Sequence, residues 1–186
     1  MPHIVIISAS VRTGRMSHRV ALYFQNFLLK QNLATVEILD LNVYQFPVFI
    51  ERLKYQSNPS PDMMDFSEKI KKADGVIIVT PEYNGGYPAS IKNVIDLLYD
   101  EWFRKPIAIT TASDGSFGGS QVITSLLFTL WKIRAWVIPA MFPVPKVEEA
   151  FTEEGHPVKK STDDRATIFI NELLWCVQAK TKMDKR

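Results

Sequence analysis

The chain has 186 residues, of which 46% are hydrophobic and 23% are charged, as is usual for a soluble globular protein with one compact domain. Its formal net charge of +2 is too small to indicate a nucleic acid or a membrane surface as a partner. No stretch approaches the roughly 20 apolar residues of a membrane-spanning helix, and the apolar start at residues 4–7 is too short for a signal peptide. We therefore expect a cytoplasmic protein, in which the single cysteine, Cys176, is a structural thiol.

The first third of the chain combines strand and helix patterns. The run His3–Ser8 is rich in β-branched residues and shows no polar alternation, which indicates a strand buried on both faces. Residues 19–29 have the spacing of an amphipathic helix, and residues 35–39 form a second strand. Residues 41–61 are a long connection with three prolines, to which the pattern assigns no role.

The same alternation continues to the end of the chain. The pattern predicts, in chain order, a helix at 63–72, a strand at 76–80, a helix at 89–99, a strand at 106–111, a helix at 121–133, a strand at 135–138 and a helix at 165–180. A Pro-rich segment and a charged stretch separate the last strand from the last helix.

Five strands that alternate with helices indicate a parallel sheet covered by helices on both faces, which is a three-layer α/β sandwich. The doubly wound strand order 2-1-3-4-5 fits best, and its switch point lies between the first and third strands. Because no repeat or linker interrupts the pattern, residues 1–186 are expected to form a single domain. The loops at 8–17 and 80–88 then face the crevice where such sheets bind ligands.

The loop at 8–17 offers hydroxyl groups, two guanidinium groups and a glycine directly before a helix. The backbone N–H groups and the dipole of a helix N-terminus attract anions, and arginine adds paired donors for phosphate oxygens. The loop therefore indicates a site for a terminal monophosphate. The alternative is that Ser10 or Ser17 only caps the helix and that the arginines are solvated. The loop has neither the glycine spacing of a Walker A or Rossmann motif nor the cysteine of a phosphatase loop.

The loop at 80–88 combines an aromatic ring, a carboxamide and two glycines, which suits a flat ligand with polar edges. Tyr83 would stack on such a ligand or pack into the core with its hydroxyl at the rim. Glu82 would be a surface residue or would contact a neighbouring subunit. A third loop, at 112–120, is rich in glycine and serine and would flank the same crevice, although taken alone it is more typical of a flexible turn.

These loops resemble those of the NADPH-dependent FMN reductase family, whose relatives include quinone, azo-dye and chromate reductases. The resemblance covers almost the whole chain and rests on three motifs: Ser10-x-Arg12-x-Gly14-Arg15-x-Ser17, Pro81-Glu82-Tyr83-Asn84-Gly85 and Gly118-Gly119. It implies a flavodoxin-like fold, a bound FMN, and NADPH or NADH as the electron donor. It also implies two groups of cofactor-binding residues: Ser10, Arg12, Arg15, Met16 and Ser17 at the FMN phosphate, and Pro81, Glu82, Tyr83, Asn84, Gly85, Ser113, Gly115 and Gly118 beside the flavin ring.

The resemblance further implies an oxidoreductase that passes hydride through bound flavin to a quinone-like or other small acceptor, or reduces free FMN. Because the cofactor carries the chemistry, no catalytic side chain is expected. His3, His18 and His156 are read as structural or surface residues, and their spacing supports no metal site. One alternative is a flavodoxin-type electron carrier without its own NAD(P)H turnover, although such carriers usually present acidic surfaces. Another is a protein that keeps only the fold and binds no flavin.

The predicted helix at 121–133 carries more apolar surface than the roughly 100° stripe that faces a sheet. The surplus would contact the Pro-rich segment or a second subunit. Since members of the family that the chain resembles are commonly dimers or tetramers, we expect a homodimer or tetramer.

Overall fold

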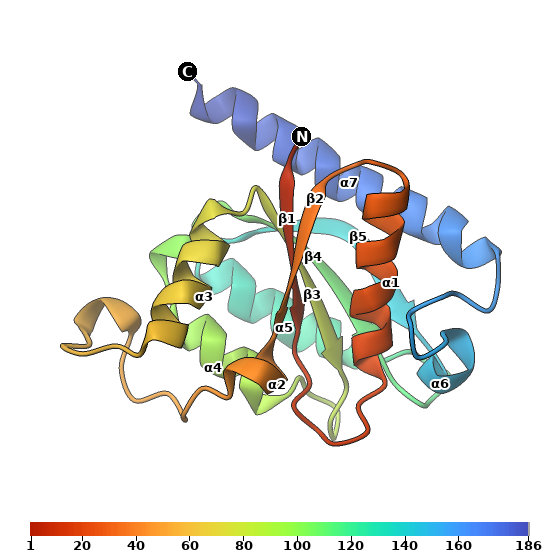
Figure 1. Ribbon diagram of the computed structural model, residues 1–186, viewed down its shortest axis with the longest axis horizontal. Helices are drawn as coiled ribbons and strands as arrows, with labels where there is room; N and C mark the ends of the chain where they lie inside the picture. The colour runs from red at the N-terminus through yellow and green to blue at the C-terminus, as the bar shows by residue number, and fades with distance from the viewer. Residues whose placement is uncertain (186) are drawn as a thin grey trace.

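A computed structural model, which describes residues 1–185, shows a five-stranded parallel sheet between two layers of helices (Figure 1). The strands are β1 (His3–Ser8), β2 (Thr35–Asp40), β3 (Gly75–Pro81), β4 (Pro106–Ala112) and β5 (Trp136–Val144). They are ordered β2-β1-β3-β4-β5, and all neighbouring pairs are parallel, which confirms the predicted doubly wound topology. The carboxyl ends of all five strands therefore meet at one edge of the sheet.

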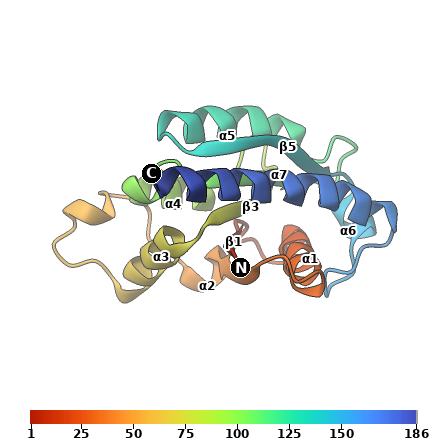
Figure 2. The same cartoon turned by 90° about the horizontal axis from the view of Figure 1, so that it is seen from above.

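The long helices divide between the two faces of the sheet (Figure 2). One face is covered by α1 (Ser17–Lys30) and α7 (Ser161–Asp184), and the other by α3 (Pro61–Lys72), α4 (Ala89–Leu97) and α5 (Ser120–Lys132). The short elements are α2 (Leu41–Tyr44), α6 (Val147–Ala150) and two 3-10 turns, Leu53–Tyr55 and Asp100–Trp102. Among the described helices, none combines the length and the apolar composition that crossing a bilayer requires.

Strand β1 shows why the sequence lacks polar alternation. Ile4 and Ile6 pack toward α1 and α7, whereas Val5 and Ile7 pack toward α3 and α4, so successive residues enter opposite halves of the core. Strands β3 and β4 are likewise buried along their whole length. Cys176 is buried in the α7 layer, as predicted, and burial raises the pKa of its thiol.

The last strand differs from its prediction at 135–138. It continues to Val144 even though Pro139 and Pro143 lie within it. Because β5 is at the edge of the sheet, a residue without an N–H group is tolerated there, and the register shift opposite Ile107 and Ile109 absorbs extra residues. The prolines that suggested the end of the strand are compatible with an edge position.

The other differences concern helix ends and short helices. Helix α7 begins at Ser161 instead of residue 165, with two aspartates in its first turn, where they complement the helix dipole. Helix α4 ends at Leu97, two residues before the predicted end. Helices α2 and α6 were not predicted, since four residues are too few to show helical periodicity.

Candidate functional site

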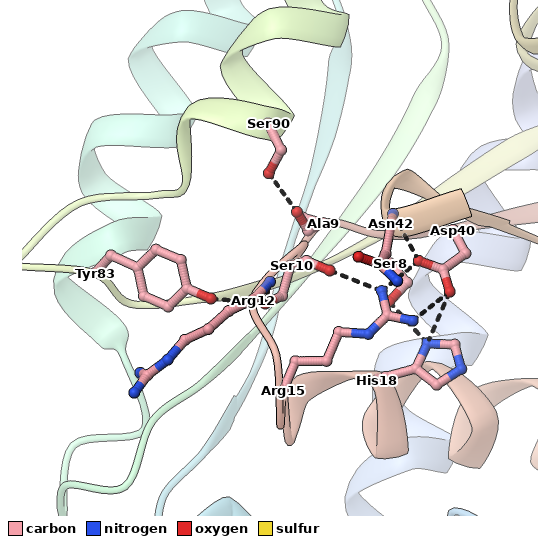
Figure 3. Close-up of polar contacts among 10 residues, drawn as sticks. All are labelled: Ser8, Ala9, Ser10, Arg12, Arg15, His18, Asp40, Asn42, Tyr83 and Ser90. Carbon is pink, nitrogen blue, oxygen red and sulfur yellow. Dashed lines mark hydrogen bonds and ion pairs between the residues drawn. The ribbon is translucent and has the colours of Figure 1, made fainter. Parts of the chain in front are cut away.

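Three loops meet at the carboxyl edge of the sheet: the first loop (residues 9–16), the second loop (82–88) and the third loop (113–119). The hydroxyl groups of Ser10 and Tyr83 lie 2.7 Å apart and join the first loop to the second (Figure 3). The N–H of Glu82 donates to the carbonyl of Ala112 at 3.1 Å and joins the second loop to the start of the third. The sequence-predicted residues therefore lie along one continuous edge.

The N-terminus of α1 lacks any side-chain cap. Met16 occupies the N-cap position, and the first turn contains no acidic residue. The side chain of Ser17 is buried, and its Oγ has no hydrogen-bond partner in the part of the chain that the structure describes. The part of the alternative in which Ser10 or Ser17 caps the helix is therefore wrong. An uncapped helix start with an unpaired buried hydroxyl group fits a bound phosphate, which can accept hydrogen bonds from both.

The two arginines of the first loop have different surroundings. Arg12 is exposed, and its guanidinium extends to the same side as the Tyr83 ring (Figure 3). Arg15 forms a two-pronged ion pair with the carboxylate of Asp40, the last residue of β2. The Nη1 atom of Arg15 also donates to the carbonyl oxygen of Ser10 at 2.7 Å.

Asp40 forms a small polar cluster with Ser8, Arg15 and His18 beside the first loop (Figure 3). Burial tends to raise the pKa of Asp40, but hydrogen bonds from Arg15 and from the backbone N–H of Asn42 outweigh it and hold the pKa below its usual value. Asp40 is therefore charged at neutral pH.

His18 lies in the same cluster. Its Nδ1 atom is 3.0 Å from Ser8 Oγ and 3.8 Å from an Asp40 oxygen. Burial and the adjacent Arg15 charge lower the pKa of His18, and Asp40 only partly opposes them. The imidazole is therefore neutral at pH 7.

The sequence pattern does not single out Asp40, and it indicates only a structural or surface role for His18. The available signal was position: Asp40 ends a strand next to β1, so the parallel topology brings it to the same edge as the first loop.

The second loop contains a tight turn. Tyr83 and Gly86 exchange backbone hydrogen bonds of 2.8 and 3.0 Å, and both central residues have positive φ, 52° at Asn84 and 79° at Gly85. Asn-Gly is the pair that this turn favours, because both residues adopt positive φ at low cost. The Tyr83 ring is half-buried and its hydroxyl reaches Ser10, so this side chain lies at the rim of the site. Pro81 is the buried last residue of β3.

The third loop is tied to its surroundings by hydrogen bonds. The carbonyl of Gly118 accepts a hydrogen bond from Thr111 Oγ1 at 2.7 Å, and Gly118 has a φ of 61°. A Cβ atom at Gly118 would lie 2.8 Å from the backbone nitrogens of Val144 and Pro145. The carbonyls of Ser113 and Gly115 accept from the N–H groups of Val147 and Lys146. Backbone contact with the end of β5 therefore explains why a glycine stands at position 118.

A groove of about 450 Å³ opens beside the first loop, between α4 and the connection at 41–61. Asn93 of α4 holds that connection from both sides of its carboxamide: Oδ1 accepts from the N–H of Phe49 at 2.6 Å, and Nδ2 donates to the carbonyl of Pro47 at 2.7 Å. The connection is thus fixed against α4 and forms one wall of the groove.

Comparison with known proteins finds relatives in sequence and in fold. The sequence profile of the family described as NADPH-dependent FMN reductase matches residues 2–149. An NAD(P)H-dependent FMN reductase of Schizosaccharomyces pombe is 31% identical over 190 residues, covering 90% of this chain and 90% of the relative. A quinone reductase of Escherichia coli is 32% identical over 123 residues, covering 63% of each chain. The flavoenzyme NAD(P)H:(acceptor) oxidoreductase FerB of Paracoccus denitrificans superposes with a TM-score of 0.78 at 21% identity, covering 96% of this chain and 98% of its own, and shows the same fold.

Proposed function

Because the chain belongs to the NADPH-dependent FMN reductase family, we propose that its first, second and third loops bind FMN and present it to NAD(P)H and to a small acceptor. The protein is an FMN-dependent NAD(P)H oxidoreductase. When bound, FMN supplies the hydride chemistry between donor and acceptor. The side chains described below bind and orient the cofactor, and none is assigned a catalytic proton transfer.

The phosphate end of FMN is assigned to the first loop and the start of α1. The observation that supports this most directly is the unpaired, buried Ser17 hydroxyl at an uncapped helix N-terminus. The backbone N–H groups of the first turn would donate to the phosphate, Met16 contributing at the N-cap position. Arg12, which is exposed, would add a guanidinium, and Ser10, which is buried, would add a hydroxyl group.

The flavin ring is assigned to the space between the second and third loops. Pro81 and Glu82 would border it at the base, and the exposed turn at Asn84 and Gly85 would bring backbone donors close to its polar edge. Tyr83 would lie beside the ribityl chain and the ring, since its hydroxyl already points to Ser10. The opposite side of the ring would meet Ser113, Gly115 and Gly118.

The acceptor is proposed to be a quinone or a free flavin, because the relatives are named as quinone reductases and FMN reductases. Both relatives are named as reductases, and that of Schizosaccharomyces pombe as NAD(P)H-dependent, which favours this function over that of a flavodoxin-type carrier. We place the protein in the cytoplasm.

We also propose that the protein is a homodimer or a tetramer. On the outer face of α5, Phe128 and Trp131 are 68% and 67% exposed, and their ring centres lie 5.8 Å apart. The Pro-rich segment leaves these rings uncovered. A second exposed apolar surface lies on the connection at 41–61, where Val48 and Ile50 are exposed. Two separate surfaces would allow a dimer through one of them or a tetramer through both.

The visible spectrum of the purified protein tests the assignment. We expect a bound or readily bound flavin that bleaches under anaerobic NADPH or NADH and is reoxidised by a quinone. Steady-state turnover with a quinone and with free FMN would then rank the acceptors. Protein that neither carries flavin nor quenches FMN fluorescence on titration would refute the proposal. Protein that binds FMN but shows no NAD(P)H turnover would favour the carrier.

A further inference from the structure

Most donor groups of Arg15 already have partners. A guanidinium has five N–H donors. In this structure Nη1 donates to the carbonyl of Ser10 and to Asp40, and Nη2 donates to the other Asp40 oxygen. The side chains of Arg15 and Asp40 are only 15% and 14% exposed. The Asp40 carboxylate neutralises the charge of Arg15, so Arg15 attracts a phosphate only weakly.

Ser10 is held at both its backbone and its side chain. Arg15 fixes its carbonyl oxygen, and through Asp40 this contact reaches the end of β2. Tyr83 fixes its hydroxyl group, and this contact reaches the loop after β3. Figure 3 shows Ser10 between these two partners, with Arg12 directed away from both Arg15 and Asp40. The first loop is therefore anchored on one side to the end of β2 and on the other to the loop that follows β3.

The charge of Asp40 has an electrostatic cost. A carboxylate close to an anion site repels a phosphate, and two charged groups withdrawn from water lose hydration. Asp40 nevertheless remains ionised, because Arg15 and the Asn42 N–H hold it in that state. The ion pair therefore reduces the electrostatic attraction of this region for a phosphate, but it fixes the position of the Ser10 carbonyl group.

We propose that Arg15 and Asp40 are positioning residues, whose ion pair holds the first loop in the conformation that binds the FMN phosphate, while Arg12 supplies the guanidinium that contacts the phosphate. This inference rests on the proposed function, in that the first loop is taken to bind FMN. It assigns Arg15 a different role from the one that the resemblance implies, and it gives Asp40 a role in cofactor binding.

The Asp40→Asn variant distinguishes a positioning role of Arg15 from a role as a phosphate ligand. The two roles predict changes of opposite sign in the affinity for FMN. If Arg15 were a phosphate ligand restrained by Asp40, removing the negative charge would free it and tighten FMN binding. If the pair positions the loop, the same variant weakens FMN binding by roughly tenfold, since an amide replaces a charge-assisted acceptor. The measurement is the Kd of the apoprotein for FMN, from quenching of flavin fluorescence.

Riboflavin, which lacks the phosphate, serves as the second ligand in every titration. We expect Arg12→Met to weaken FMN binding and to leave riboflavin binding within about twofold, because only the phosphate contact is lost. Arg15→Lys keeps the charge but cannot form the two-pronged pair. It should therefore weaken FMN binding as Asp40→Asn does, whereas a residue that acts by charge alone would be rescued by lysine.

A double-mutant cycle completes the test. For a positioning pair, Arg15→Met should cost less FMN affinity in the Asp40→Asn background than in the wild-type background, because Asp40 no longer orients the guanidinium toward the Ser10 carbonyl. A loss at least as large as in the wild-type background would identify Arg15 as a direct ligand and overturn the proposal. Thermal unfolding of each apoprotein shows that the variants compared are folded, and Arg15→Lys replaces Asp40→Asn if the latter is not. If wild-type protein fails to bind FMN, the proposed function fails; if it binds FMN and Asp40→Asn binds more tightly, only this inference fails.

Discussion

The hydroxyl oxygens of Ser10 and Tyr83 lie 2.7 Å apart, and this contact joins the loops that follow β1 and β3. These strands are neighbours in the sheet but are separated in the chain by α1, β2, α2, a 3-10 turn and α3. The doubly wound strand order brings the two loops together at its switch point. The proposed phosphate and ring ends of the FMN site are thus coupled through one pair of side chains.

Tyr83→Phe tests this coupling. The variant keeps the aromatic ring and loses the hydrogen bond, so we expect a loss of about 1 kcal/mol in FMN binding, or roughly a fivefold rise in Kd. Fluorescence titration measures it. Tyr55→Phe, on the exposed connection, is the matched control and should leave the Kd unchanged. Equal affinities for Tyr83→Phe and wild type would show that the contact does not support FMN binding.

Ser17→Ala should have opposite effects on the apoprotein and on the complex. The buried Ser17 Oγ lacks a partner among the described residues, so removing it should leave the apoprotein as stable as wild type or more so. FMN binding should weaken by about 1 kcal/mol if the hydroxyl donates to the phosphate. Thermal unfolding with and without FMN measures both effects. A variant with unchanged FMN affinity would remove Ser17 from the site.

Gly118→Ala and Gly115→Ala form a matched pair within the third loop. At Gly118 the positive φ and the nearby backbone of β5 leave no space for a Cβ atom, so we expect a loss of about 1–3 kcal/mol in the free energy of unfolding. At Gly115 the nearest atom to a Cβ lies 3.8 Å away. Chemical denaturation should show a change below about 0.5 kcal/mol there. Similar losses at both positions would contradict this reading of the loop.

The lowered pKa of Lys105 predicts how the free energy of unfolding changes at alkaline pH. Its Nζ donates to the carbonyls of Lys71 and Ala73 at the end of α3, and burial, helped by the charge of Lys180, lowers its pKa to about 8. The unfolded chain keeps the pKa near 10.5, so between these values the unfolded state binds more protons than the folded state. The contribution of Lys105 to stability therefore increases as the pH rises from about 8 to about 10.5.

Lys105→Met removes that contribution. We expect the free energy of unfolding of the wild type minus that of Lys105→Met to be larger at pH 9.5 than at pH 7.5. Urea denaturation at both pH values measures this difference. Lys72→Met, at an exposed position at the end of α3, is the control for the removal of a lysine side chain from this region. A difference that is constant with pH would show that the amine keeps the same proton affinity in both states.

Charge introduced on α5 tests the proposed assembly. Phe128→Glu and Trp131→Glu place carboxylates on the exposed aromatic pair, and they should dissociate an assembly formed through α5, as measured by size exclusion with light scattering. Val48→Glu performs the same test on the connection. If substitutions at each of the two surfaces dissociate a larger species step by step, the protein is a tetramer. A monomeric wild-type protein would refute the assembly proposal.

The topology could be predicted because each strand is a short apolar run and each long helix shows its own periodicity. The contacts within the polar cluster at the first loop could not be predicted from the sequence. They depend on the register that sets Ser8 opposite Asp40, and on a rotamer that carries Arg15 across that gap. Both are long-range properties of the folded chain. The loop motifs revealed which residues to examine, but the different surroundings of Arg12 and Arg15 became visible only in three dimensions.

The prolines of β5 have a consequence for how copies of this protein can meet. Two of the nine residues of this edge strand, Pro139 and Pro143, have no N–H group to offer to a further strand. A second chain therefore cannot extend the sheet continuously past β5. Any lasting association on this side has to form between side chains, so single substitutions can strengthen or weaken the association. The edge itself resists the strand-to-strand pairing that leads to aggregation.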